Sequence, residues 1–537
     1  MAERDRAPSS RVDVCVVGAG PAGAIVAARL AEAGHDVVVL DAGPRFDLED
    51  RERQLDAHLR PGVESAGNRS AAGDGLWGMG GDRDAYTSSG DRHYPLNAAR
   101  VKGLGGSTLH WQAMVMRLHE RDFEMDSRHG VGVDWPIDYA DLRPYYTEAE
   151  RELGVAGADD NPFAPPREEP FPLPAFPPSH SDSIFAEACE RLGLPTHSVP
   201  NARNSEPNDG ASACVGYGTC KPVCPSGAKY TAERHVARAE AAGARVIDRA
   251  PVQRLAHDAD AVDAAVYATP DGAEHRQEAR AVVLACGGVE NVRLLLLSAS
   301  DAYPDGLANS SGLVGRYFMD HCFAGVGGRI DRPTRQNHVG FNTTECHALY
   351  DAEDPLPGVK LEFLNYAGPS PVIDALHADE WGDDLLDSLR DSYGTHLAVG
   401  GLVEQFPHAD NRITLDRSTT DDHGNPVPDV EWSVGTETRR AIERANEVQR
   451  AILEELDADI DWVVGPDETG PAFHHMGTTR MGTDPESSVV ASDCRAHDLD
   501  NLWIAGSSVF PTAGGMNPTL TIAALSCRLA DRLDRWL

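Results

Sequence analysis

The chain has 537 residues, of which 41% are hydrophobic, so it can bury more than one core and two structural domains are expected. Acidic residues number 85 against 48 basic ones, which gives a formal net charge of −37. Lysine occurs at only four positions. This composition excludes nucleic acid and anionic membrane surfaces as partners, because binding to phosphate needs basic patches.

The carboxylates are spread through the chain rather than collected in an acidic tail, and short groups of them recur at 258–263, 379–384 and 421–422. A large net charge strains the compact state by self-repulsion. Concentrated salt screens this repulsion, because the Debye length falls to about 3 Å at 1 M. The composition therefore predicts a halophilic protein, adapted to a salt-rich cytoplasm.

The sequence contains no run of about 18 apolar residues, so no transmembrane helix is expected. Its first ten residues are polar and lead directly into a predicted strand, unlike a signal peptide. Ten cysteines are scattered apart from one cluster, which is not the pattern of a disulfide framework. We expect a cytoplasmic enzyme without direct membrane insertion, unless a separate subunit carries it to a membrane.

A βαβ unit opens the chain. Residues 12–17 predict a buried strand, residues 21–33 a helix, and residues 37–40 a second strand that ends in Asp41. The turn between the first strand and the helix carries three glycines at the GxGxxG spacing: Gly18, Gly20 and Gly23. This order predicts a dinucleotide site, in which the helix N-terminus binds the pyrophosphate and Asp41 binds a ribose diol. Asp41 disfavours a 2′-phosphate, which leaves NAD or FAD.

A cysteine cluster lies near the middle of the chain, where Cys214, Cys220 and Cys224 follow a C-x5-C-x3-C-P pattern. Zinc fits poorly, because zinc sites usually have paired C-x2-4-C spacing and four ligands. A proline directly after the last cysteine is typical of ferredoxin-type ligation. Two of the four lysines, Lys221 and Lys229, lie in this segment and would offset the charge of such a cluster.

Three further segments decide the cofactor. They read GGSTLHW at 105–111, HHMGTTRMG at 474–482 and NLWIAGSSVFPTAGGMNPTLT at 501–521. With the N-terminal glycines, they resemble the glucose–methanol–choline (GMC) family of FAD oxidoreductases, and the stretches 282–296 and 314–321 look like further signatures of it. The resemblance implies FAD rather than NAD.

The resemblance also implies the fold, which is of the α/β class. A discontinuous Rossmann-like FAD-binding domain would be joined to an α+β substrate domain with an antiparallel sheet. Glycine-rich segments and short strand-like pieces at 335–430 fit this division, and loops at 60–95 and 155–210 could cover the active site. The expected segments are 1–150, 211–330 and 466–537 for FAD binding, 151–210 for a lid and part of the substrate domain, and 331–465 for substrate binding.

Oxidation of an alcohol removes a hydroxyl proton and a hydride, so the protein needs a base beside the flavin. The resemblance places His474 in that role and Asn517 in the partner position. His475 is adjacent, and we expect it to point into packing. Asn517-Pro518 also opens a predicted helix at 518–535, where asparagine would serve as N-cap; both roles can hold together.

The remaining cofactor contacts are also implied by the resemblance. The histidine of the STLHW motif, His110, is bonded covalently to the flavin in some relatives and only covers its ring in others, so both options stay open. The full expected FAD-binding set is Gly18, Gly20, Gly23, Asp41, Gly105, Gly106, Ser107, His110, Gly506, Asn517 and Pro518.

The cysteine segment resembles that of bacterial FAD-dependent glucose, sorbitol and gluconate dehydrogenases, some of which bind a 3Fe-4S cluster. Reduced cysteines or a disulfide are the other interpretations. We expect a dehydrogenase acting on a sugar, polyol or other alcohol, with electrons passing to an external acceptor such as a small subunit or cytochrome. Two other hypotheses remain: a GMC oxidase that uses oxygen, and a non-catalytic flavin electron-transfer subunit.

Overall fold

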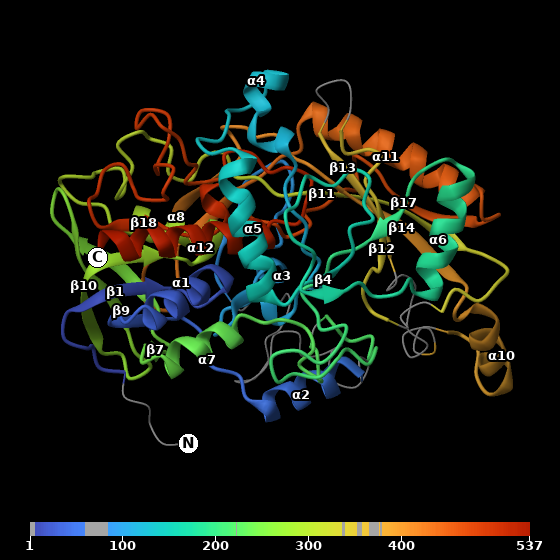
Figure 1. Cartoon of the computed structure of the whole chain (residues 1–537), viewed down its shortest axis with the longest axis horizontal. Helices are drawn as coiled ribbons and strands as arrows, with labels where there is room; N and C mark the ends of the chain where they lie inside the picture. The colour runs from blue at the N-terminus through green and yellow to red at the C-terminus, as the bar shows by residue number, and fades with distance from the viewer. Residues whose placement is uncertain are drawn as a thin grey trace.

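The computed structural model describes residues 6–59, 84–221, 223–335, 339–351, 357–364, 375 and 378–537. Two sheets organise these residues, one towards each end of the long axis in Figure 1. Much of the predicted loop 60–95 lies outside the described residues. Within the described part of the chain, no helix is long and apolar enough to cross a membrane.

The first sheet has seven strands and includes the opening βαβ unit. Strand β1 pairs in parallel with β2 and with β10, and β10 pairs in parallel with β18, so strands from both ends of the chain lie in one sheet. The strands are β7 (Arg245–Ile247), β2 (Val37–Leu40), β1 (Val12–Val17), β10 (Glu274–Leu284), β9 (Val262–Ala268) and β8 (Val252–His257), with β18 (Leu502–Ile504) beside β10.

Helices cover this sheet. Helix α1 (Pro21–Glu32) packs against α7 (Glu233–Ala241) and α12 (Thr519–Trp536), and α12 packs against α5 (Tyr139–Leu153). Helix α8 (Gly287–Leu297) follows β10 and contacts β8. Continuous apolar strands are expected where helices cover a parallel sheet, and β2 is buried along its whole length.

The second sheet is antiparallel and has six strands. In order, they are β17 (Asp459–Val464), β11 (Cys322–Arg329), β14 (His396–Val403), β13 (Val359–Phe363), β12 (Thr344–Cys346) and β6 (His197–Ser198). Helix α11 (Thr436–Glu454) packs against β11 and β14, while α6 (His180–Arg191) contacts β13. The predicted fold class is confirmed; the exact domain boundaries stay a prediction.

Smaller elements complete the fold. A three-stranded sheet joins β15 (Arg412–Thr420), β16 (Pro426–Glu431) and β3 (Thr87–Ser88), and a short pair joins β4 (Ala156–Gly157) and β5 (Leu173–Pro174). Further helices in the described part of the chain are α2 (Leu48–Leu59), α3 (Leu96–Ala99), α4 (Met125–His129) and α10 (Asp383–Ser392), with 3-10 turns at Gly106–Leu109, Glu120–Phe123 and Ser507–Val509.

The C-terminal helix begins one residue later than the sequence predicts. Pro518 occupies the N-cap position, and no side chain caps the helix there. Asn517 therefore does not act as the N-cap, and its side chain bonds elsewhere in the site described below. The prediction that Asn517 caps this helix is therefore wrong by one residue.

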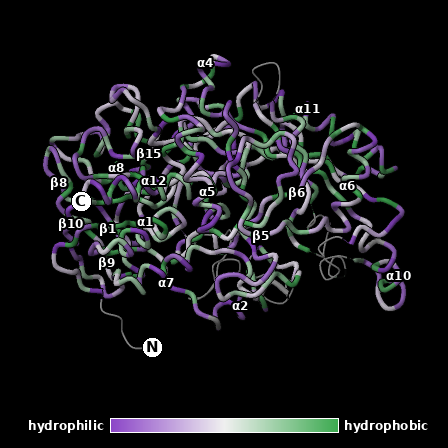
Figure 2. The backbone as a smooth tube through the Cα atoms, in the orientation of Figure 1, coloured by the Kyte–Doolittle hydropathy of each residue, from purple (hydrophilic) through white to green (hydrophobic). Residues whose placement is uncertain are grey.

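The acidic groups lie on the surface, and hydrophilic stretches recur around the periphery of the tube in Figure 2. Asp258, Asp260 and Asp263 are exposed, as are Asp383 and Asp384. Their mutual repulsion weakens when the Debye length shrinks from about 10 Å at 0.1 M salt to about 3 Å at 1 M.

We therefore expect the thermal unfolding midpoint to rise by several degrees, on the order of what 1–2 kcal/mol produces, when KCl is raised from 0.1 M to 2 M. Differential scanning fluorimetry measures the midpoint, and sucrose at equal osmolality is the control. An unchanged or lower midpoint in KCl would contradict the predicted adaptation to salt.

Candidate active site

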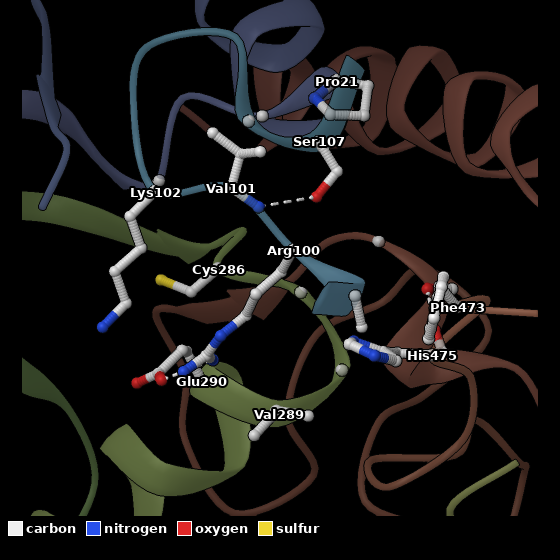
Figure 3. A pocket seen from close by; sticks show the side chains of 18 of the residues that line it. Pro21, Arg100, Val101, Lys102, Ser107, Cys286, Val289, Glu290, Phe473 and His475 are labelled. Atoms are coloured by element: carbon white, nitrogen blue, oxygen red, sulfur yellow. Dashed lines mark hydrogen bonds and ion pairs between the residues drawn. The ribbon is translucent and has the colours of Figure 1, made fainter. Parts of the chain in front are cut away.

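A cavity of about 730 Å³ runs from the glycine turn after β1 to the antiparallel sheet. Its walls come from segments far apart in the sequence, and Figure 3 shows part of them: Arg100 reaches towards Glu290, with Cys286 and Lys102 on one side and Phe473 and His475 on the other. At the second sheet it is bordered by Phe323, Glu362 and Leu402. This is the size class of small-molecule and cofactor sites.

The turn after β1 has the backbone that a dinucleotide needs. Gly18 has φ +99°, and a Cβ there would lie 2.6 Å from the carbonyl oxygen of Ala285. A Cβ on Gly23 would lie 2.0 Å from the carbonyl oxygen of Gly18, so this glycine lets α1 approach the strand. Around Gly20, by contrast, a Cβ would meet no atom within 4 Å, so the second glycine leaves its face open to the cavity that it lines.

Asp41 lies at the end of β2, as predicted, and is buried. Its carboxylate accepts hydrogen bonds from the backbone N–H groups of Ala19 and Gly43, both at 2.8 Å. Burial raises the pKa of Asp41, and these two N–H donors oppose the shift. Each carboxylate oxygen keeps a second lone pair, and Asp41 lines the cavity, so the group can also accept from a ribose hydroxyl.

The second predicted motif meets the first in space. The N–H of Gly105 donates to the carbonyl oxygen of Ala19 at 3.0 Å, and a Cβ on Gly106 would lie 3.0 Å from the Cα of Gly20. The same cavity is lined by Ser107 and His110 of this motif, and by Gly506 and Pro518 of the segment 501–521. The open face at Gly20, the N-terminus of α1 and the free lone pairs of Asp41 together fit the adenosine and pyrophosphate of FAD.

His474 and Asn517 meet at the cavity wall, with Nε2 of His474 3.4 Å from Nδ2 of Asn517. The backbone N–H of His474 donates to Asp320 at 2.8 Å, and the preceding Phe473 has φ +70°. A positive φ of this kind lies in the left-handed region, which is strained for residues other than glycine, and such strained residues are often found at functional sites. Burial lowers the pKa of His474 well below 6.5, and the neighbouring His321 and Lys360 lower it further, so the imidazole is neutral.

His475 takes the packing position. Its ring lies 5.7 Å from the ring of Tyr94 and 5.8 Å from that of Phe318. Burial lowers its pKa to about 3. Its ring also borders the cavity, but no described hydrogen bond joins it to Asn517.

Two buried residues complete the site, and the sequence analysis missed the role of both. His321 contacts His474 through the two Nδ1 atoms, 2.8 Å apart. Lys360 donates to Oδ1 of Asn517 at 3.0 Å and to Glu345 at 2.6 Å. The signals were present: His321 ends the VGRYFMDH stretch, and Lys360 is one of four lysines, in an otherwise apolar strand with Glu362 two residues on.

The cysteine segment lies beside the segment around His110. Lys229 is buried, and its Nζ donates to the carbonyl oxygens of Leu109, Trp111 and Cys220. Burial lowers the pKa of Lys229 to about 7. This lysine therefore ties the loop that carries the cysteines to the segment around His110.

All three cysteines are free thiols, with Cys220 buried and Cys214 and Cys224 half-buried. Burial would raise the pKa of Cys224, but the N–H of Lys229 and the hydroxyl of Ser226 outweigh it and lower the pKa. Among the described residues, no group of three or more His, Cys, Asp or Glu side chains has an arrangement that could hold a metal ion. As they stand, the thiols do not form a ligand set.

Comparisons with known proteins identify the family of the chain. Two models described as GMC oxidoreductase match residues 86–323 and 407–526, and one of an NAD(P)-binding Rossmann-like domain matches residues 16–49. The chain belongs to the GMC oxidoreductase family. The predicted assignment as an FAD-dependent oxidoreductase that acts on CH–OH groups is confirmed.

Relatives match over nearly their full length. The large subunit of fructose dehydrogenase from Gluconobacter japonicus is 34% identical, over 97% of each chain. A 2-methyl-1,2-propanediol dehydrogenase from Mycolicibacterium austroafricanum is 30% identical, over 98% of this chain and 96% of that one. Among solved structures, formate oxidase from Aspergillus oryzae superposes with a TM-score of 0.69 at 18% identity, over 98% and 99% of the two chains, which supports the fold.

The open face at Gly20 yields a prediction. Gly20 has an extended backbone conformation that alanine can adopt, so Gly20→Ala should leave the thermal midpoint of the cofactor-free protein unchanged. The added methyl group would occupy the approach to the pyrophosphate, and overpacking of about 1–3 kcal/mol corresponds to about 5- to 150-fold weaker FAD binding. Titration of the apoprotein with FAD measures the affinity. Gly470→Ala, also in open space, is the matched control, and equal affinities of the two variants would contradict the assignment.

Proposed function

We propose that this protein is a dehydrogenase that oxidises a secondary or primary hydroxyl group of a sugar or polyol, with His474 as the base and Asn517 as its partner. The observation that carries the proposal is the contact of the two side chains across 3.4 Å, on the wall of a cavity that begins at the dinucleotide turn. The buried, neutral imidazole of His474 is suited to accept a proton.

The chain's own residues have separate tasks in the reaction. His474 accepts the hydroxyl proton at Nε2, and Asn517, through Nδ2, donates a hydrogen bond to the substrate oxygen. Phe323 and Leu402, which border the cavity at the second sheet, exclude water from the reacting carbon. FAD would supply the acceptor for the carbon-bound hydride while His474 takes the hydroxyl proton, so that the alcohol is oxidised to a carbonyl.

A sugar or polyol is supported by the names of the relatives. Besides the fructose and propanediol dehydrogenases, they include a paromamine 6'-oxidase from Streptomyces fradiae, 29% identical, and a gluconate 2-dehydrogenase flavoprotein from Pantoea cypripedii, 25% identical. All four names denote substrates with two or more hydroxyl groups. Glu362, a carboxyl group on the cavity wall, supplies an acceptor for a second hydroxyl.

A substrate panel tests the proposal. Holoenzyme in high salt would be mixed anaerobically with ketoses, aldoses, polyols, choline and simple alcohols, and the loss of flavin absorbance would be followed. We expect bleaching by at least one sugar or polyol, and faster reduction than with methanol or ethanol. Bleaching only by choline or a monohydric alcohol would overturn the proposed substrate class.

The electron acceptor is the second part of the proposal. We propose an external one-electron acceptor, such as a small subunit or a cytochrome, because two relatives are named as a large subunit and a flavoprotein of dehydrogenases. Oxygen uptake comparable with dye reduction would instead favour the oxidase hypothesis, which the relatives named oxidases keep open. A cytoplasmic location remains a prediction from the sequence, with membrane association through a partner subunit as the alternative.

A 3Fe-4S cluster at Cys214, Cys220 and Cys224 remains a proposal that rests on the sequence pattern and on the contacts of Lys229 with Cys220 and Cys224. Against it stands the absence of a metal-ligating group among the described residues. Iron and sulfide analysis of anaerobically purified protein decides the point: about three irons per chain would support the cluster. Iron-free protein with full activity towards a one-electron dye would exclude it.

A further inference from the structure

Two buried residues outside the reacting pair contact the side chains of His474 and Asn517. His321 contacts the ring of His474 from behind, and Lys360 contacts Asn517 from the far side. Both are fully buried, so water does not replace these contacts. A histidine that acts as a base must present a bare nitrogen to the substrate, and the hydrogen bonds at its other nitrogen decide which one is bare.

The hydrogen bonds that link His474, His321 and the carbonyl of Gly514 can run in only one direction. Nε2 of His321 lies 2.7 Å from the carbonyl oxygen of Gly514, which can only accept, so this nitrogen carries a hydrogen. Burial lowers the pKa of His321 to about 4, so the ring is neutral and its Nδ1 is bare. Across the 2.8 Å contact between the Nδ1 atoms, His474 must then be the donor.

The contacts of Asn517 lead independently to the same protonation state of His474. The ammonium of Lys360 can only donate, so the atom of Asn517 that it contacts at 3.0 Å is the amide oxygen. The amide nitrogen of Asn517 therefore faces Nε2 of His474. Because an amide nitrogen only donates, Nε2 of His474 is the acceptor and carries no hydrogen.

The carbonyl that begins the chain is held firmly. Gly514 has φ +60°, and a Cβ there would lie 2.6 Å from the side chain of Leu118. The next residue, Gly515, donates its N–H to the hydroxyl of Tyr350 at 2.9 Å. This loop therefore holds the Gly514 carbonyl oxygen in place. The hydrogen bond that His321 donates to it from Nε2 leaves Nδ1 of His321 as the acceptor that faces His474.

We propose that His321 is a positioning residue that holds His474 in the tautomer with hydrogen on Nδ1 and a bare Nε2. In the same proposal, Lys360 binds the amide oxygen of Asn517 and so turns the amide nitrogen, a hydrogen-bond donor, towards Nε2 of His474. His321 and Lys360 touch neither substrate nor flavin in this role. The inference deepens the proposed function, since a bare Nε2 matters only if His474 is the base.

The test compares two substitutions of His321 in the holoenzyme. In His321→Gln, the amide retains one donor and one acceptor, as the neutral imidazole does; in His321→Leu, both are lost. We expect kcat for flavin reduction to fall by about 10²- to 10⁴-fold in His321→Leu, the range for a misplaced general base, with KM nearly unchanged. His321→Gln should recover at least tenfold of that loss.

A spectroscopic measurement gives a second readout that does not depend on activity. Nitrogen-15 spectra of histidine-labelled holoenzyme separate protonated from bare ring nitrogens, and the His474 signal is identified by its loss in His474→Ala. We expect the Nδ1–H form of His474 in the wild type and in His321→Gln, and a mixture of forms in His321→Leu. The wild-type spectrum decides the matter even if His321→Leu does not fold.

The outcomes separate this inference from the proposed function. An Nε2–H form in the wild type, or equal losses in the leucine and glutamine variants with an unchanged tautomer, would overturn the role of His321. Full flavin reduction in His474→Ala would instead overturn the function of His474 as base, whatever its tautomer.

Discussion

His474→Ala should lower the rate of flavin reduction by substrate by about 10²- to 10⁴-fold, the usual contribution of a general base. In the proposed reaction the buried imidazole accepts the hydroxyl proton, and an alanine leaves Asn517 able to hold the oxygen but provides no group to take the proton. Anaerobic stopped-flow bleaching of the flavin measures the rate. The affinity for FAD and the thermal midpoint should change little, because the backbone of residue 474 stays bonded to Asp320.

Two further histidine variants control this experiment. His408 is exposed and pairs with the exposed Asp410, so His408→Ala should keep the wild-type rate. His475→Gln tests the neighbouring histidine, which packs against Tyr94 and Phe318, and should reduce the rate far less than His474→Ala. A larger loss in the His475 variant would move the role of base to that residue.

The burial of His474 also predicts the pH dependence of the reaction. Desolvation lowers its pKa well below 6.5, and the base works only in its neutral form. The dependence of kcat/KM on pH should therefore show no loss attributable to His474 as the pH falls from 8 through 6.5, since the imidazole remains neutral there. A decline with an apparent pKa near 6.5 that disappears in His474→Ala would show that the ring is solvated in the working enzyme.

Local patterns in the sequence predicted the parts of the site that short segments carry. The glycines of the first turn and Asp41 were predicted because their roles follow from a strand, a turn and a helix in succession. In the structure, β1, the glycine turn, α1 and β2 follow in that order, and Asp41 accepts from Ala19 and Gly43. Dinucleotide binding by these residues stays a prediction. Two features were misplaced. The cap at Asn517 reflects how little separates one helical start from the next, and the predicted loop 155–210 contains helix α6 and strand β6 of the antiparallel sheet.

The supporting residues could not be predicted in the same way, because tertiary structure brings them together. His321 meets His474 across 153 positions of sequence, and Lys360 meets Asn517 across 157. The strand that carries Lys360 lies in the region from 330 to 465, where no readable motif appears. A lysine and a glutamate in an apolar strand indicate a buried ion pair, but they do not reveal which amide the lysine contacts.

Lys360→Met should destabilise the protein by about 3–5 kcal/mol, the cost of removing one partner from a buried ion pair. The ammonium is fully buried between Glu345, at 2.6 Å, and Glu362, at 3.5 Å. Methionine has nearly the same length, so it leaves little cavity and isolates the effect of charge. The urea midpoint measures the loss. Arg390→Met is the matched control, because its ion pair with Asp387 is exposed and such pairs contribute about 0–1 kcal/mol.

The difference in stability between wild type and Lys360→Met, measured as the urea midpoint, should narrow as the pH falls. Burial acts to raise the pKa of Glu345, but Lys360 and a hydrogen bond from His347 lower it to about 2. In the wild type, this depressed pKa contributes stability above pH about 4.3, the unfolded value, and the contribution is lost as the pH falls towards 2. Without the lysine, burial dominates and raises the pKa of Glu345 above its unfolded value, so protonation stabilises the variant in acid. Urea midpoints at pH 7.5 and 5 test the sign, and a gap that widens in acid would show that Glu345 is not held ionised by Lys360.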